Sequence, residues 1–269
     1  MPRYKLEAKN TATTSDNKIH DDAVAKGLGF SGGLVPGVDV YAYLCHLPAE
    51  RWGEAWLASG TMSGRFLSPV YDGDTVTVES EESGDSMVLR LHDSAGALCA
   101  EGSAAVSRLA SPESGDVSLE SFPMAALPAR DERPPASVGS LVGVLGSLEL
   151  GFHAGKTSEY LDDVREHLDL FRTLGFAHPA WLLRQANYVL SSNVKLGPWI
   201  HVSSDSTHLS AVRDGERVSV RAKVAEVYER KGHRIVDLDV LFVADERPAM
   251  YVKHSAIFEP RQVSQSSSA

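Results

Sequence analysis

Short stretches in which apolar and polar residues alternate recur along the chain and predict β-strands. Residues 75–78 (Thr-Val-Thr-Val) and 218–220 (Val-Ser-Val) show the two-residue period of half-buried strands. Each stretch follows an Asp-Gly pair, at residues 72–73 and 214–215, and this dipeptide is typical of tight turns because glycine readily adopts positive φ. The pattern therefore predicts antiparallel strands in both halves of the chain.

Both halves are predicted to share one order of elements: a short strand, a short helix, a longer helix, and then three or four strands. The longer helix begins at Gly37 in the first half and at Pro179 in the second, and proline is tolerated in the first turn of a helix. In the first half, the other predicted elements are a first strand at 4–8, a short helix at 21–27, and a last hairpin formed by 88–91 and 97–106. In the second half, they are a first strand at 147–152, a short helix at 160–171, and a last hairpin formed by 233–243 and 250–258.

A constant spacing of 142 residues relates the two halves. Residues 66–78 (Phe-Leu-Ser-Pro-Val-Tyr-Asp-Gly-Asp-Thr-Val-Thr-Val) match residues 208–220 (His-Leu-Ser-Ala-Val-Arg-Asp-Gly-Glu-Arg-Val-Ser-Val). Several matches in the same order predict an internal duplication. Further matches are Leu6-Glu7 with Leu148-Glu149 at the same spacing, and Ser103-Ala104 with Ser255-Ala256 at a spacing of 152.

The chain is therefore predicted to hold two units, 1–108 and 140–262. Residues 109–139 contain five prolines and read as an extended linker, and the Ser-rich tail 263–269 is expected to be disordered. An antiparallel sheet around one long helix is an α+β arrangement. The order of elements resembles the hotdog fold, so the whole chain is predicted to be a double hotdog.

Composition and charge narrow the possible functions. Of the 269 residues, 43% are hydrophobic and 23% charged, as in globular proteins, and the net charge of −10 argues against nucleic acid or a membrane as partner. Cys45 and Cys99 form no CxxC or Cys/His cluster, so neither a disulfide framework nor a metal site is predicted. No phosphate-binding or dinucleotide motif predicts a cofactor. The polar start indicates no signal peptide, and a cytoplasmic location is expected.

The residues that could carry chemistry gather in a polar, Gly-rich segment ahead of the first long helix. His20 can take or give a proton near neutral pH, and Asn17 can orient a water or hold a carbonyl. Gly37, at the start of the helix, offers an unblocked N–H to a developing oxyanion. Together these groups suit chemistry at the α and β carbons of a thioester.

Each of these residues also has an ordinary structural explanation. Asp21 and Asp22 in the first turn of a helix are favourable without any catalytic role, and Ser15 or Asn17 could cap a turn. His20 alone is better explained as a structural histidine. The occurrence of all these groups together favours a functional site.

Residues 17–22 (Asn-Lys-Ile-His-Asp-Asp) resemble the hydratase motif of MaoC-like (R)-specific enoyl-CoA hydratases, Asp-x-Asn-Pro-x-His-x-Asp. Residues 66–76 are similar to that family's Phe-x-x-Pro-Val-x-x-Gly-Asp-x-Val strand, and Gly37 falls where the family has a His-Gly pair. The resemblance covers most of residues 1–108. In the second unit Glu159 and Asp162 stand where the first has Asn17 and His20, so one active site is expected.

The resemblance implies a lyase mechanism. In the family, the Asp and His of the motif activate one water, which adds to a trans-2-enoyl thioester, and the reverse reaction dehydrates a 3-hydroxyacyl thioester. The resemblance implies that His20 is the acid and base, that Asn17 helps to position it, and that the Gly37 amide polarises the thioester carbonyl.

The motif departs from the family at its first position. The family Asp, five residues before the His, corresponds to Ser15, and Asp16 lies one place later; Pro36 stands at the helix-start His. Adjacent side chains of an extended chain point in opposite directions, so Asp16 replaces the family Asp only if the loop bends differently. Because of this departure, two alternative functions remain open. The protein could be a hotdog enzyme repurposed as an isomerase, cyclase or thioesterase, or a non-catalytic acyl-binding protein.

Other candidates depend on the same comparison with hotdog enzymes. Some of these enzymes carry a catalytic carboxylate on the long helix, where Asp39 is available, although a first-turn acid is explained by the helix dipole. Arg65, His201 and His208 are candidates for the cleft between the units. The expected substrate is an acyl thioester of coenzyme A or of a carrier protein, and the expected assembly is a monomer or a homodimer.

Overall fold

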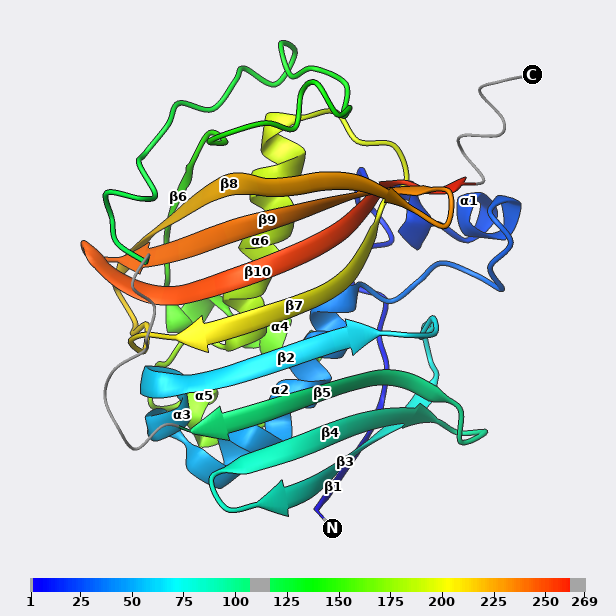
Figure 1. Cartoon of the computed structure of the whole chain (residues 1–269). Coiled ribbons are helices and arrows are strands. Elements are labelled where there is room, and N and C mark those ends of the chain that lie inside the picture. Colours follow the sequence, from blue (N-terminus) through cyan, green and yellow to red (C-terminus); the bar gives the residue numbers. More distant parts are fainter. Residues whose placement is uncertain (1, 107–116, 262–269) are drawn as a thin grey trace.

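The computed structural model describes residues 2–106 and 117–261 (Figure 1). Ten strands form one antiparallel sheet in the order β1-β3-β4-β5-β2-β7-β10-β9-β8-β6. The expected unit end at residue 108, the start of the linker (109–116) and the tail 263–269 lie outside the described residues. None of the helices in the described ranges is long and apolar enough to cross a membrane.

The sheet is built from two sets of five strands, which meet where β2 pairs with β7. The first set consists of β1 (Arg3–Glu7), β2 (Gly60–Phe66), β3 (Thr75–Ser83), β4 (Ser86–Asp93) and β5 (Leu98–Val106). The second set consists of β6 (Leu148–Gly151), β7 (Ile200–His208), β8 (Arg217–Arg230), β9 (His233–Ala244) and β10 (Arg247–Glu259).

In the described part of the chain, eight helical segments accompany the strands. In the first unit they are η1 (Lys18–His20), α1 (Asp22–Gly27), α2 (Gly37–Trp52) and α3 (Glu54–Ser59). In the second unit they are η2 (Ala154–Lys156), α4 (Ser158–Asp163), α5 (Asp169–Arg172) and α6 (Pro179–Asn193). The single helix expected at 160–171 is thus interrupted between α4 and α5, where Arg165 has a positive φ of 59° that a helix cannot accommodate.

The hydrogen bonds show how far the duplication extends. Isolated bridges join Leu34 to Tyr71 and Phe176 to Arg213, and both residues of the second bridge follow those of the first by 142 positions. The last strands do not follow the expected spacing of 152. Ala104 pairs with Met62 whereas His254 pairs with Ser204, which makes the spacing 150.

The first strands are also offset by two residues, since Leu6 lies opposite Val76 and Leu150 lies opposite Val218. A shift of two keeps every side chain on the same face of the sheet, so the apolar pattern is equally satisfied in both registers. Only the pairing of the strands distinguishes them.

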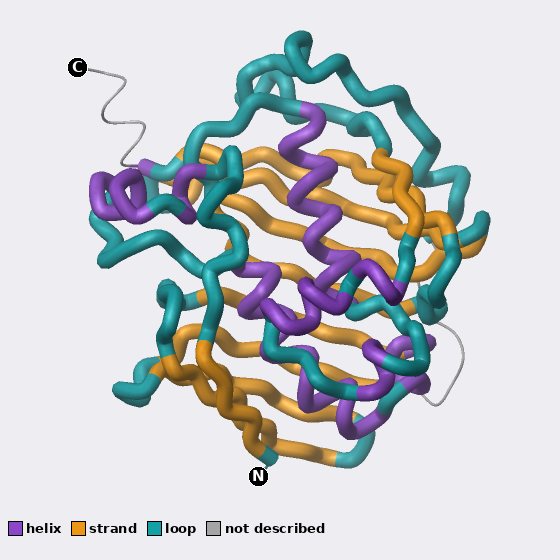
Figure 2. Tube along the Cα trace, turned by 180° about the vertical axis from the view of Figure 1, so that it is seen from behind, coloured by secondary structure: helices purple, strands orange, loops and turns teal. Residues whose placement is uncertain are grey.

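The helices lie on one face of the sheet, and α2 and α6 pack against each other and against the strands (Figure 2). Twelve of the sixteen residues of α2 are buried, including Tyr41 and Leu44, which are fully enclosed. A helix that is buried on nearly all sides must be apolar on nearly all sides. Each enclosed large side chain stabilises the fold by roughly 1.5–3 kcal/mol.

The described part of the linker passes around the second unit. Phe122 packs on Leu241 and Val243, which alternate along β9 with core residues and therefore face away from the helices. Farther along, the Arg133 side chain donates to the Ser191 carbonyl near the end of α6. The linker thus brings residues 127–133 to the side of the sheet that carries the helices.

Candidate active site

His20 ends the short helix η1, and both of its ring nitrogens lie near polar partners. Nδ1 is 2.7 Å from the Leu34 carbonyl oxygen, and Nε2 is 3.4 Å from Asn17 Nδ2. Because a carbonyl only accepts, Nδ1 carries the proton and Nε2 of the neutral ring keeps a lone pair. Burial lowers the pKa of His20 and outweighs the Leu34 carbonyl and the Asp39 carboxylate, which raise it. His20 is therefore placed to act as a base.

Asn17 holds this part of the first unit against the second unit. Its Nδ2 donates to the Trp199 carbonyl (3.0 Å), and its Oδ1 accepts from the Trp199 amide (3.2 Å). Oδ1 also accepts from the Ile19 amide at the start of η1. Asn17 therefore both shapes the turn that carries His20 and connects it to the segment before β7.

The structure does not bring Asp16 to His20. The side chain of Asp16 is 91% exposed, and it forms an ion pair with Arg130 of the linker at 3.4 Å. Ser15 Oγ accepts from the Asn17 amide at 3.1 Å. Within the described residues, no hydrogen bond or ion pair joins Ser15 or Asp16 to His20.

Asp39 is fully buried in the first turn of α2, where it joins the two units. Its carboxylate accepts from Thr11 Oγ1 at 2.6 Å and forms an ion pair with Arg184 of α6. A carboxylate with these partners is poorly suited to act as a free base. Its charge nevertheless raises the pKa of His20, so Asp39 affects the site from within the core.

Gly37 begins α2 behind Pro36, which supplies no side-chain cap. The Pro36 carbonyl accepts from the Asp39 and Val40 amides, and no hydrogen bond from the Gly37 amide is found in the described part of the chain. His201 of β7 packs directly on Gly37, because a Cβ added at residue 37 would lie 3.0 Å from its Nδ1. Glycine allows this close approach without a shift of His201, and the Gly37 amide at the helix start is available to a ligand.

Two hollows meet at His20. One is a cavity of about 210 Å³, here called the acyl cavity, whose walls are mostly apolar. The other is a polar cleft of about 860 Å³, here called the cationic cleft. The residues that line both hollows are Asn17, His20, Pro36, Asn187 and Trp199.

The walls of the two hollows differ in chemistry. The acyl cavity is lined by side chains such as Ile19, Phe30, Val40 and Phe66. The cationic cleft is lined by the cations Arg130, Arg133, Arg184 and Lys195, with Asp16 as the acidic residue among its lining. Gly37 lines the acyl cavity, and the preceding residue, Pro36, lines both hollows as His20 does.

Comparisons with known proteins agree on the architecture. No family model matches the chain, and no curated protein matches its sequence. A conserved hypothetical protein of Mycobacterium tuberculosis, Rv0216, which is described as a double hotdog, aligns over 95% of both chains with 13% identity and a TM-score of 0.63. The chain is a double hotdog. The fold predicted from the order of elements is thereby confirmed.

Two other solved structures share this fold. A MaoC-like dehydratase aligns over 96% of this chain and 98% of its own, with 14% identity and a TM-score of 0.58. A proposed thioesterase from Novosphingobium aromaticivorans aligns over 96% of both chains, with 12% identity and a TM-score of 0.58. At such identities the likeness concerns the fold of the double hotdog.

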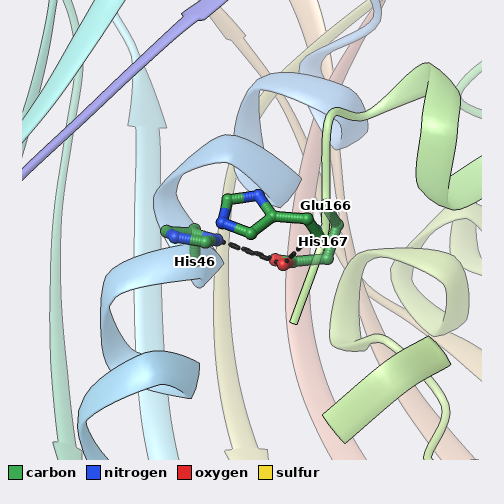
Figure 3. A group of neighbouring side chains, drawn as sticks. All are labelled: His46, Glu166 and His167. Carbon is green, nitrogen blue, oxygen red and sulfur yellow. Dashed lines mark hydrogen bonds and ion pairs between the residues drawn. The ribbon is translucent and has the colours of Figure 1, made fainter. Parts of the chain in front are cut away.

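Figure 3 shows a second polar group of the double hotdog, formed by His46, Glu166 and His167. None of these residues lines either hollow. His46 of α2 lies 3.1 Å from Glu166 Oε1, and the backbone amide of His167 donates to the same oxygen at 2.7 Å. These three side chains could hold a metal ion, since their ligand atoms lie within 4.8 Å of one another. The nearby His178 cannot join them as a neutral ligand, because its Nδ1 accepts from Ala180 and its Nε2 must carry the proton.

The same group is explained without a metal as a buried carboxylate with donors around it. Burial raises the pKa of Glu166, but interactions with His178 and His46 outweigh burial and hold the pKa below its usual range. Glu166 is 2% exposed and is therefore a buried charge at the contact of α2 with the second unit.

Several residues of the site were not predicted from the sequence. Trp199, Arg184 and Asn187 belong to the second unit, and Arg130 belongs to the linker, more than 100 positions from His20. No local pattern marks them. Among the weaker candidates, His201 lines the acyl cavity, whereas Arg65 and His208 line neither hollow.

Proposed function

We propose that this protein is a hydratase and dehydratase of acyl thioesters, which adds water to an enoyl thioester or removes it from a 3-hydroxyacyl thioester. The observation that carries the proposal is the position of His20 between the acyl cavity and the cationic cleft. A thioester whose carbonyl lies at this boundary would place its acyl chain on one side and its carrier on the other.

The two hollows suit the two ends of such a substrate. The acyl cavity would remove an apolar chain from water, which is favourable in proportion to the buried area. In the cationic cleft, Arg130, Arg133 and Lys195 would face the phosphates of a carrier. This local excess of cations occurs in a chain of net charge −10, so it is a feature of the cleft and not of the whole surface.

Hydration requires a base, an acid and a group that stabilises the enolate. In the proposed reaction His20 Nε2 removes a proton from water as the water oxygen bonds to C3 of the enoyl group. The electron pair moves to the thioester oxygen, which accepts a hydrogen bond from the Gly37 amide. His20 then returns the proton to C2, so the ring ends neutral as it began. The MaoC-like dehydratase with the same fold supports this reaction class.

The test is the loss of enoyl absorbance when crotonyl-CoA and longer enoyl thioesters are mixed with the protein. His20→Ala should lower the rate by roughly 10²- to 10⁴-fold, the usual contribution of an acid–base group. His153→Ala, at an exposed histidine of the second unit, serves as the matched control. If no enoyl or 3-hydroxyacyl thioester turns over, the proposal is wrong.

A thioesterase is the second candidate, because the proposed thioesterase from Novosphingobium aromaticivorans shares the fold and Ser15 replaces the family Asp. The geometry favours it less, since Ser15 Oγ accepts from the Asn17 amide and has no contact with His20 that would activate it. Release of free thiol from a saturated acyl-CoA, without loss of enoyl absorbance, would replace the first candidate by this one.

A further inference from the structure

The boundary between the two hollows contains one polar atom that the mechanism above does not use. Asn17, His20 and Asn187 are the residues with polar side chains that line both hollows. Both ends of the Asn17 amide bond the Trp199 backbone, and its Nδ2 also lies 3.4 Å from His20 Nε2. Asn187 Oδ1, on α6 of the second unit, is buried and has no hydrogen-bond partner.

A buried acceptor without a partner is costly, typically more so than a formed hydrogen bond is favourable. Such atoms therefore call for an explanation, and a bound water that donates to the acceptor is a common one. The cost at Asn187 would be relieved by a water that donates one proton to Oδ1. The other proton of that water would point at the lone pair of His20 Nε2, where it would replace the long hydrogen bond of 3.4 Å from Asn17 Nδ2.

We propose that Asn187 is a further catalytic residue, whose side-chain oxygen holds and orients the reacting water against His20. The inference rests on the proposed hydration reaction. It assigns to the second unit the task that the motif Asp performs in MaoC-like hydratases and that Ser15 and Asp16 do not perform here. One O–H bond of the water breaks as its proton moves to His20 Nε2, and the other O–H donates to Asn187 Oδ1 without transfer.

An amide differs from a carboxylate in one measurable way. Asn187 cannot take up a proton, so a single group, His20, would titrate during hydration. The pH profile of kcat/KM should then show one acid limb. In Asn187→Asp a second ionisable group enters the site, and the profile should gain a second inflection. A purely structural Asn187 would not change the shape of the profile.

The decisive experiment combines turnover with thermal unfolding. Asn187→Leu removes the unpartnered oxygen and should raise Tm by about 2–4 °C, whereas kcat for crotonyl-CoA should fall by roughly 10- to 100-fold. Asn187→Asp restores an acceptor and should keep much more of the activity than Asn187→Leu. The control is Gln185→Leu, because Gln185 is a buried amide on the same helix that lines neither hollow.

The outcomes separate this inference from the function on which it rests. A wild-type rate in Asn187→Leu, together with inactivity of His20→Ala, would overturn the role of Asn187 and leave the hydratase intact. Equal losses in Asn187→Leu and Gln185→Leu would also overturn it, because the effect would then belong to the helix. Inactivity of the wild-type protein toward every enoyl thioester would remove both proposals.

Discussion

The N-termini of the two long helices occupy equivalent places in the two units but have different surroundings. At α2, Pro36 gives no side-chain cap, and Gly37 lines the acyl cavity. At α6, 142 positions later, His178 accepts a hydrogen bond from the Ala180 amide at 3.1 Å. One helix start leaves its donors available to a ligand, and the other uses a side chain to satisfy them.

The rest of the second unit's equivalent segment is occupied by packing. The buried Glu166 lies between His46 of α2 and His178, and none of these three residues lines either hollow. Asp162, the counterpart of His20, is exposed and pairs with Arg172. The two units thus share the fold at both helix starts, whereas the acyl cavity and the cationic cleft meet at the start of α2.

The second unit nevertheless contributes to the site of the first. Trp199 holds Asn17, Arg184 pairs with Asp39, and His201 packs on Gly37. The site is therefore assembled across the contact between units, and each unit alone would lack part of it.

The largest expected effect concerns the buried group of Glu166, His46 and His178, here called the Glu166 group. Glu166→Gln removes the buried charge that His46 and His178 surround, and breaking such an arrangement typically costs about 3–5 kcal/mol of the free energy of unfolding. Chemical denaturation measures this loss. Asp16→Asn, at the exposed pair with Arg130, should cost less than about 1 kcal/mol. Equal losses would show that the Glu166 group does not hold the units together.

Acid should destabilise the protein through two buried histidines of the second unit. Burial lowers the pKa of His208 and of His254 to about 4, whereas the pKa of an unfolded histidine is about 6.5. The unfolded chain therefore binds more protons, and stability falls as the pH falls from about 6.5 to 4, by about 3 kcal/mol per residue. Denaturation across this range should give a shallower slope in His208→Leu. An unchanged slope would contradict the assignment.

Paired substitutions at the starts of α2 and α6 compare the two helix starts directly. Gly37→Ala would place a Cβ 3.0 Å from His201 Nδ1, so either the ring or the helix start must move. We expect kcat for hydration to fall roughly tenfold, since displacement of an oxyanion donor is costly. Pro179→Ala, at the equivalent position of α6, should leave kcat unchanged. Similar effects of both substitutions would mean that Gly37 acts only through folding.

The smallest expected effect is a gain. Ser15→Asp restores the carboxylate of the family motif at the edge of the cationic cleft and should raise the hydration rate by roughly tenfold or less. The rate of enoyl-CoA loss measures it, with Asp162→Ala in the second unit as a neutral comparison. No gain would show that Ser15 is not the departure that limits the rate.

Part of the site could be predicted from local sequence. The spacing of Asn17, His20 and Gly37 is a property of one short segment, and the turn at Asn17 and the start of α2 follow from local hydrogen bonds and backbone preferences. The direction of Asp16 could not be predicted, because its partner Arg130 is 114 positions away. Neither could Asn187, which resembles any other polar residue of an amphipathic helix.

The sequence by itself determined the double fold, because alternation, turn residues and the 142-residue spacing are local or repeated signals that sum over many positions. Only the tertiary structure decided the strand registers, the side of the sheet reached by the linker, and which helix start opens into a hollow. These features depend on contacts between residues far apart in the chain. Such contacts form only when both units are folded against each other, and no periodicity records them.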